Sequence, residues 1–281
     1  MTKADYYLAY GIQKIKEFGY KDENPRPKYK DGTPAHTYSV NHVGRMYDLG
    51  IGEFPICTLR PIAWKTAIKE IFTIYQKPTN VISEMEQMGV KWWNEWDIGD
   101  GSIGQRYGGT VKRYDLINNL IHKIETNPYG RDKIMDLWQE KDLRETKGLN
   151  PCAFLTIWNV RGKSLDMMLI QRSGDMLMAS GGGGVNEVQY AALLMMIARH
   201  TGYEPGVFSH VVANEQIYDR HTEAADELFK RFNEHIDDQP ENQPQLILNP
   251  DKNNFYDFTI DDFEMINYDP IKPQLTLDIG I

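Results

Sequence analysis

The stretch of sequence that decides the fold is NPCAFLTIWNVRGKSLDMMLIQRSGD, residues 150–175. Two β-rich runs lie within it, Cys152–Val160 and Leu165–Ser173, and the segment Arg161-Gly162-Lys163 separates them. Two such runs around a short glycine-containing connection predict a β-hairpin. Pairing of the two runs would bring Arg172 into the general region of Cys152.

Other periodicities extend outward from this hairpin. Asn186–His200 is apolar on nearly every face, which predicts a buried helix. The first 20 or so residues and Thr222–His235 show the spacing of amphipathic helices. Further helices are expected after Pro61, from about Val81 to Met88 and over Leu116–Ile124. Further strands are expected at Thr37–Tyr47, Phe54–Leu59 and Ile134–Trp138. Loops are expected at 24–33, 97–109 and 237–245, with a flexible break at 179–184.

Strands and helices mix along the chain without strict alternation. This arrangement predicts an α+β fold, with a mixed sheet and flanking helices. No shift in composition marks a boundary, so residues 1–281 are expected to form a single domain.

The charge balance limits the partners of the chain. Its 281 residues include 31 Lys and Arg against 40 Asp and Glu, a formal net charge of −9. Nucleic-acid binding depends on neutralising phosphates, so we expect no nucleic-acid partner. A small anion is not excluded, because a few arginines in one pocket outweigh the net charge at short range.

Apolar runs and cysteines limit the location of the chain. No run approaches the roughly 20 residues of a membrane helix, and the polar start has no secretory pattern. We therefore expect no membrane partner and a cytoplasmic protein. The two cysteines are too few for a disulfide framework or a cysteine zinc site, and no metal is expected.

Cys152 is the first candidate for chemistry. It follows Asn150-Pro151 where a loop meets a strand, so its thiol can face a ligand while its backbone is held rigid. A nucleophilic cysteine needs a lowered pKa, which a nearby arginine would provide. The alternative is a buried structural cysteine. We favour that interpretation for Cys57, because its neighbours are mostly apolar.

Three other features have plainer explanations. The run Gly181–Gly184 precedes a helix and could cradle a phosphate, but it lacks the Lys-Ser/Thr of a nucleotide loop. A hinge or a close-approach loop is favoured there. His221 and His235 form no His-Glu-x-x-His pattern and are interpreted as surface or helix-end residues. The acidic pairs 237–238 and 261–262 are interpreted as solvated.

A series of short motifs resembles the folate-dependent thymidylate synthases. The motifs are Asp31–Thr37, Trp64–Glu70, Trp93–Trp96, Tyr107-Gly108, Asn127-Pro128 with Arg131, Asn150–Cys152, Gln171–Asp175, Asn186 with Gln189–Ala191, Tyr218 with His221, and Phe255–Phe258. Each is weak alone. Their joint order and spacing extend the resemblance over nearly the whole chain.

The resemblance implies a homodimer that converts dUMP to dTMP by reductive methylation. The co-substrate 5,10-methylenetetrahydrofolate would supply both the methyl group and the hydride. Cys152 would add to C6 of the uracil, so that C5 becomes a carbon nucleophile and attacks the folate methylene. Asn186 would hydrogen-bond the uracil edge, where charge develops on the pyrimidine carbonyl.

The same resemblance assigns roles to further residues. The residues expected to contact the nucleotide are Gln171, Arg172, Ser173, Tyr218, Gln216, Arg26 and, from the other subunit, Arg131. The arginines would hold the phosphate, because a guanidinium meets phosphate oxygens in two places. The residues expected near the folate are Asp175, Trp93, Tyr107 and the tail ending in Gly280-Ile281. Glu70 would organise water and proton transfers.

Several positions depart from the family pattern. Asp132 stands where a second phosphate-binding arginine is usual, with Lys133 as a possible substitute. Ala153 and Gln216 stand where histidines are frequent, and Asn94 replaces an aspartate. The segment before Asn186 is longer and richer in glycine than usual.

These departures leave two alternatives open. One is a dUMP or dCMP hydroxymethylase, in which water traps the same folate-derived intermediate; Asn186 favours uracil there. The other is a weakly catalytic relative that binds nucleotide or its own mRNA. The charge of −9 and the intact Cys152, Arg172 and Asp175 speak against it.

Overall fold

The computed structural model describes residues 1–238 and 242–280. Its helices are α1 (Lys3–Phe18), α2 (Trp64–Ile71), α3 (Ile82–Gln87), α4 (Gly108–Tyr114), α5 (Leu116–Thr126), α6 (Glu140–Glu145), α7 (Val185–Thr201) and α8 (Thr222–His235). Its strands are β1 (Tyr20–Lys21), β2 (Thr37–Asp48), β3 (Ile134–Asp136), β4 (Ala153–Arg161), β5 (Ser164–Gln171), β6 (Gly174–Asp175), β7 (Glu204–Tyr218), β8 (Gln245–Leu248) and β9 (Phe263–Ile266).

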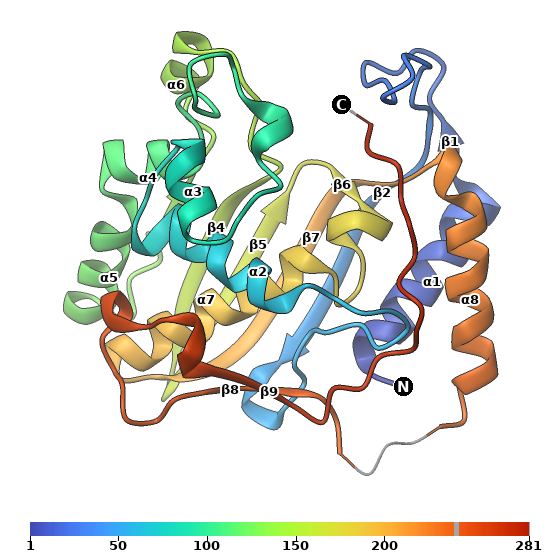
Figure 1. Cartoon of the computed structure of the whole chain (residues 1–281). Coiled ribbons are helices and arrows are strands. Elements are labelled where there is room, and N and C mark those ends of the chain that lie inside the picture. The colour runs from blue at the N-terminus through green and yellow to red at the C-terminus, as the bar shows by residue number, and fades with distance from the viewer. Residues whose placement is uncertain (239–241, 281) are drawn as a thin grey trace.

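A mixed sheet forms the centre of the molecule (Figure 1), in the order β1-β2-β7-β5-β4-β3, with β6 beside β7. The predicted hairpin is confirmed: β4 and β5 pair antiparallel, and Ala153 lies opposite Gln171. β7 pairs parallel with β5 and antiparallel with β2. The parallel pairing and the surrounding helices confirm the predicted α+β class.

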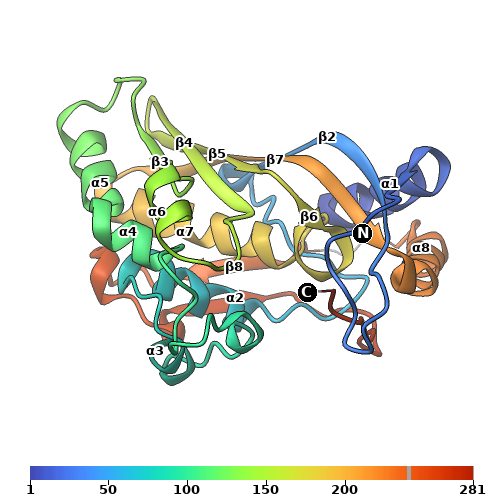
Figure 2. The ribbon, with the colours of Figure 1, turned by 90° about the horizontal axis from the view of Figure 1, so that it is seen from above.

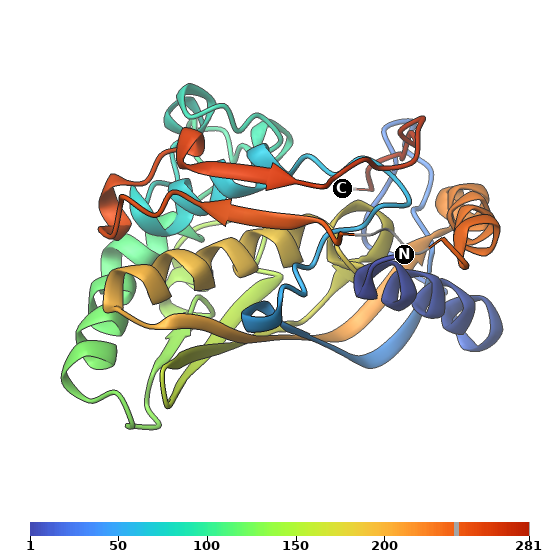
Figure 3. The same ribbon diagram turned by 90° about the horizontal axis from the view of Figure 1, so that it is seen from below.

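Helix α7 explains the all-round apolar pattern of its sequence. It lies along one face of the sheet, and the β8–β9 ribbon runs over its other side (Figure 3). Residues 188–194 are therefore all buried. Such burial stabilises the fold by about 25 cal/mol for each Å² of apolar surface removed from water.

The two faces of the sheet differ. The helices gather on the face that carries α7, and in the residues described the opposite face carries no helix (Figure 2). Strand residues alternate between the two faces. On the bare face this leaves apolar side chains partly exposed, including Met46, Ile157, Met168 and Val211.

Two segments differ from the sequence predictions. The run Phe54–Leu59 is not a strand but an irregular buried segment, in which the N–H of Cys57 donates to the carbonyl of Gly183 at 3.0 Å. A short apolar run indicates burial but not what the segment pairs with. Periodicity therefore could not distinguish a strand from an irregular buried segment. The expected surface loop 97–109 is exposed only at its start, because 106–109 are buried and Gly108 begins α4.

The glycine run is a tightly packed turn and not a flexible break. Residues 181–184 are buried against α1 and the 56–57 segment. A Cβ on Gly182 would lie 2.4 Å from the carbonyl oxygen of Ala4. A Cβ on Gly183, where φ is +67°, would lie 2.1 Å from the backbone nitrogen of Cys57. The close-approach interpretation is therefore correct.

Two polar residues interpreted as solvated are buried. His221 is 0% exposed and Asp262 is 7% exposed, whereas His235 is partly exposed at the end of α8, as predicted. Asp262 accepts hydrogen bonds from the N–H and the hydroxyl of Thr259, at 2.8 and 2.9 Å. Local polarity could not reveal these tertiary contacts.

Candidate active site

A cavity of about 1100 Å³ lies at the open end of the β4–β5 hairpin, opposite its turn, and beside the N-terminus of α7. The predicted site residues that line it are Arg26, Glu70, Trp93, Tyr107, Cys152, Gln171, Arg172, Ser173, Asp175, Asn186, Gln216 and Tyr218. The structure thus brings together residues spread over almost 200 positions of sequence. Arg131 lies outside this lining and is exposed between α5 and β3. Ile281 lies outside the described residues.

Cys152 is held at the edge of the sheet by two backbone hydrogen bonds. Its N–H donates to the hydroxyl of Tyr107 at 3.1 Å, and its carbonyl accepts from the N–H of Arg172 at 2.9 Å. Nη2 of Arg172 lies 3.5 Å from Sγ. Burial nevertheless raises the pKa of the Cys152 thiol, and Arg172 and Arg26 offset this only in part. The expectation of a lowered pKa is therefore wrong for the cavity as it stands.

Arg172 is fixed in place by the loop before β4. Its Nε donates to the carbonyl of Pro151 and its Nη2 to that of Asn150, both at 2.9 Å. Its guanidinium lies 5.7 Å from the ring centroid of Trp138. The hairpin register therefore places a preorganised cation beside the thiol, as the sequence predicts.

Tyr107 has a strained backbone. Its φ is +46°, a region that residues other than glycine rarely adopt and that costs about 1–3 kcal/mol. The strain aims its hydroxyl at the backbone of Cys152 and packs its ring 5.0 Å from that of Trp93. Such outliers cluster at functional sites.

Glu70 is a buried carboxyl at the back of the cavity. Its Oε1 accepts from Nε1 of Trp93 at 2.5 Å, and its Oε2 accepts from Nε2 of Gln189. Burial raises its pKa to about 7, and these hydrogen bonds oppose the rise. A carboxyl with that pKa both holds and releases a proton near neutral pH.

Asn186 joins two glutamines at the start of α7. Its Oδ1 accepts from Nε2 of Gln171 at 3.2 Å, and its Nδ2 donates to Oε1 of Gln189 at 3.0 Å. Gln171 also donates to the carbonyl of Ser173 at 3.0 Å. The amide of Asn186 is thereby held on both sides while it faces the cavity.

Asp175 and the C-terminal tail form another wall. Oδ1 of Asp175 caps the turn that follows it, accepting from the N–H groups of Leu177 and Met178 at 3.1 Å each. Burial raises the pKa of the Asp175 carboxyl, against the influence of His221. Nε2 of His221 lies 2.7 Å from the carbonyl oxygen of Asp278, and the next two tail residues line the cavity.

The ring of Tyr218 lies beside that tail. A Cβ on Gly280 would lie 2.9 Å from it, so the tail packs closely there. Burial raises the pKa of Tyr218 to about 12, which keeps its hydroxyl protonated at neutral pH. It is therefore available as a hydrogen-bond donor.

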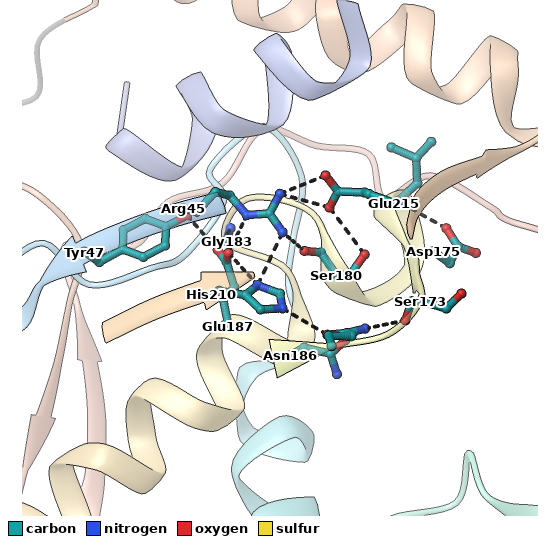
Figure 4. Close-up of polar contacts among 12 residues, drawn as sticks. Arg45, Tyr47, Ser173, Asp175, Ser180, Gly183, Asn186, Glu187, His210 and Glu215 are labelled. Atoms are coloured by element: carbon teal, nitrogen blue, oxygen red, sulfur yellow. Dashed lines mark hydrogen bonds and ion pairs between the residues drawn. The ribbon is translucent and has the colours of Figure 1, made fainter. Parts of the chain in front are cut away.

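Behind the cavity lies a buried cluster of charged residues that the sequence did not reveal (Figure 4). Arg45 donates from Nε to Glu187 at 2.6 Å and from Nη1 to both carboxylate oxygens of Glu215 at 2.9 Å. His210 connects the cluster to the cavity. Its Nδ1 lies 3.0 Å from Glu187 and its Nε2 lies 3.0 Å from Oε1 of Gln171.

Among the departures from the family pattern, Asn94, Ala153 and Gln216 line this cavity, whereas the charged residues Asp132 and Lys133 do not. Asp132 is exposed and pairs with Lys123 at 3.0 Å. Lys133 is buried and donates to the carbonyl of Gly130. Neither contributes to the lining.

The sequence did not reveal the site roles of the buried cluster and of Gln189. A signal existed for each. Gln189 stands three positions after Asn186, a spacing that places two side chains on the same face of a helix. Glu187 and His210 are polar groups inside otherwise apolar elements, and buried polar groups require partners.

The fold and the cavity define a class: an α+β enzyme whose cleft combines a thiol, arginines and a buried carboxyl. A family model described as thymidylate synthase matches residues 6–280. The chain therefore belongs to the thymidylate synthase family, as its motifs predict. It is similar to the thymidylate synthases of Lactococcus lactis subsp. cremoris (strain SK11), with 48% identity, and Streptococcus pneumoniae (strain 70585), with 47%. Both matches cover 100% of each chain.

A solved structure agrees. The thermostable thymidylate synthase A from Bacillus subtilis superposes with a TM-score of 0.88 at 33% identity, covering 99% of both chains. The predictions of a methyltransferase and of this fold are confirmed, and the hydroxymethylase alternative is not favoured. In the described part of the chain, no helix is long and apolar enough to cross a membrane.

Proposed function

We propose that this chain converts dUMP to dTMP in the cavity around Cys152, with 5,10-methylenetetrahydrofolate as co-substrate. The observation that carries the proposal is the meeting of Cys152, Arg172, Asn186 and Glu70 in one cavity of about 1100 Å³. Each group is of the type that the chemistry requires. Folate supplies the one-carbon unit and the hydride.

Cys152 is the nucleophile of this mechanism. The thiol releases its proton to solvent, the thiolate Sγ bonds to C6 of the uracil, and the electron pair of the C5–C6 π bond moves toward the carbonyl at C4. Nη2 of Arg172, 3.5 Å from Sγ, stabilises the thiolate as it forms. The bond to C6 breaks at the end of the reaction, because a thiolate is also a workable leaving group.

Asn186 and Glu70 act on the pyrimidine. Asn186 meets the N3 and O4 edge of the uracil with one donor and one acceptor. Glu70, with its pKa raised to about 7, exchanges protons with ordered water at the ring. Gln171 holds Asn186 in place from behind.

The remaining residues divide between nucleotide and folate. Those proposed to hold dUMP are Arg172, Ser173, Arg26, Gln216 and Tyr218. Those proposed to contact folate are Asp175, Trp93, Tyr107 and the tail through Ile281. The tail carbonyl of Asp278 is bonded to His221, which supports a tail that lies over the cavity.

We also propose a homodimer, with Arg131 reaching the phosphate of the partner's nucleotide. The bare, partly apolar face of the sheet supports this, since an uncovered apolar sheet face is typical of an interface (Figure 2). Arg131 is exposed and lies outside the cavity of its own chain. Mixing Arg131→Ala with Cys152→Ala subunits tests the proposal, because mixed dimers would regain one complete site. A monomeric protein would contradict the homodimer, and a dimer whose mixed form regains no activity would contradict the role of Arg131.

Two further expectations, on domain organisation and on cellular compartment, complete the proposal. Residues 1–281 act as one catalytic domain, which the largely continuous hydrophobic core supports. The protein works in the cytoplasm, a reducing compartment, which the free thiols of Cys57 and Cys152 support.

The deciding experiment identifies both products formed from dUMP and methylenetetrahydrofolate. dTMP with dihydrofolate is expected. Hydroxymethyl-dUMP with tetrahydrofolate would overturn the proposal. Cys152→Ala is expected to abolish turnover, whereas Cys57→Ala, at the other and fully buried cysteine, retains it.

A further inference from the structure

Gln189 links the two groups that act on the pyrimidine. It is 3% exposed on α7, one turn after Asn186. Its Oε1 accepts from Nδ2 of Asn186 at 3.0 Å, and its Nε2 donates to Oε2 of Glu70. One carboxamide therefore contacts both residues.

The direction of these hydrogen bonds is fixed from both sides. The carbonyl of Ser173 can only accept, so Gln171 turns Nε2 toward it and toward Oδ1 of Asn186. At the other side Glu70 in its ionised form can only accept, so Gln189 turns its Nε2 toward Glu70 and its Oε1 toward Asn186. Reversing the Asn186 amide would set donor against donor and acceptor against acceptor, which costs free energy at both contacts.

The fixed direction leaves Asn186 with one free N–H and one free oxygen lone pair, in a set spatial order. Uracil offers N3–H as a donor and O4 as an acceptor. Cytosine offers the reverse, with N3 as an acceptor and its 4-amino group as a donor. The orientation of the Asn186 amide therefore decides which base fits.

We propose that Gln189 is a positioning residue that sets the preference for uracil by orienting Asn186, and that it ties this orientation to the carboxyl of Glu70. The inference deepens the proposed function and rests on it. Gln189 does two separable things: it gives Asn186 an acceptor and it gives Glu70 a donor. Two variants separate them.

Gln189→Met keeps the length of the side chain and removes both contacts. Gln189→Glu keeps an acceptor for Asn186 but replaces the amide donor to Glu70 with a second carboxyl, so that the two carboxyls share one proton. Gln76→Met is the matched control, because Gln76 is a buried amide that donates to the carbonyls of Phe255 and Phe258 outside the cavity. For each protein, kcat/KM for dUMP is measured against pH, dissociation constants for dUMP and dCMP are measured by calorimetry, and thermal unfolding checks the fold.

In Gln189→Met, the ratio of dCMP to dUMP dissociation constants is expected to fall about tenfold, the worth of one oriented hydrogen bond. In Gln189→Glu, the ratio is expected to stay within about threefold of the parent. In both variants the pH dependence of kcat/KM is expected to move to higher pH, because Glu70 loses the amide donor to its ionised form and, in Gln189→Glu, also faces a second carboxylate. The neighbouring hydroxyls of Tyr107 and Tyr190 stay protonated, since burial raises their pKa values well above the usual range. Gln76→Met changes neither readout.

A uniform loss of affinity for both nucleotides, with an unmoved pH profile, would overturn the inference and leave Gln189 a structural residue. An equal fall of the ratio in Gln189→Glu would overturn the orienting role. If Gln189→Met does not fold, Gln189→Glu tests the orienting role through its ratio of dissociation constants and the tie to Glu70 through its pH profile. Failure of the proposed function looks different: the parent protein itself would then form no dTMP.

Discussion

Two buried glutamates, Glu70 and Glu187, lie toward opposite ends of one chain of hydrogen bonds, and their acidities differ widely. Burial raises the pKa of Glu70 to about 7. Burial acts on Glu187 in the same direction, but Arg45 and His210 outweigh it and lower the pKa to about 2. Each carboxyl also accepts neutral hydrogen bonds, from Trp93 and Gln189 in one case and Tyr47 and Gly183 in the other.

The difference teaches what a cation does to a buried carboxyl. Arg45 lies 2.6 Å from Glu187, whereas in the described residues no cation lies within ion-pair distance of Glu70. A paired carboxylate stays charged at every physiological pH and serves as structure. An unpaired one stays near its midpoint and serves as a proton exchanger.

The largest expected effect comes from removing the cation. Arg45→Met leaves the carboxylates of Glu187 and Glu215 buried without their partner, and the free energy of unfolding is expected to fall by about 3–5 kcal/mol. Urea denaturation measures this. Arg144→Met is the control, because its pair with Glu140 is 82% exposed on the arginine side, and a change within about 0.5 kcal/mol is expected there. Equal losses in both variants would contradict the comparison.

The next effect is on catalysis. Glu70→Gln replaces the proton exchanger by an amide and is expected to lower kcat by at least about a hundredfold. Its loss of stability is expected to be smaller than that of Arg45→Met, because no buried charge is stranded. Steady-state kinetics with dUMP and urea denaturation test the two halves. An active Glu70→Gln enzyme would remove Glu70 from the mechanism.

The two glutamates also predict opposite pH dependences of stability. Glu187, with a lowered folded pKa, stabilises the fold above pH 4.5, and this contribution is lost as pH falls toward 2. Glu70, with a raised folded pKa, keeps its proton in the folded state while the unfolded chain releases it. Stability therefore falls as pH rises from 4.5 to about 7.

Unfolding free energies of the parent and of Glu70→Gln at pH 5 and pH 8 measure this effect. The parent is expected to lose about 2 kcal/mol relative to the variant between the two values. If the unfolding free energies of the two proteins changed equally between pH 5 and pH 8, the pKa of Glu70 would not be raised in the folded protein.

The smallest expected effect comes from removing one hydrogen-bond donor to Glu187. Tyr47 donates its hydroxyl to Oε2 of Glu187 at 2.6 Å, while Gly183 donates its N–H to the same oxygen at 2.7 Å. Tyr47→Phe is expected to cost about 1 kcal/mol of stability, because one donor and the cation remain. Thermal and urea unfolding give the value, and kcat is expected to stay unchanged. A cost as large as that of Arg45→Met would show that the donors, and not the cation, hold Glu187.

Much of the fold was predictable because long elements carry their own periodicity. The hairpin β4–β5 and helices α1, α7 and α8 were found from spacing alone. The Phe54–Leu59 segment was not, since an apolar run looks the same whether it pairs in a sheet or packs under a glycine turn. The burial of His221 was missed because its partner, the carbonyl of Asp278, is 57 residues away.

The sequence by itself determined the family, the hairpin and the set of reactive groups, because motif order, hydrophobic spacing and residue type can be read directly along the chain. Only the tertiary structure decided how acidic those groups are. Glu70 and Glu187 are the same residue type, both are buried and both lie on helices, and the sequence offers no reason to separate them. Arg45 comes from a distant strand and pairs with one of the two. A pKa depends on burial and on charges a few ångströms away, and distance in space is set by folding.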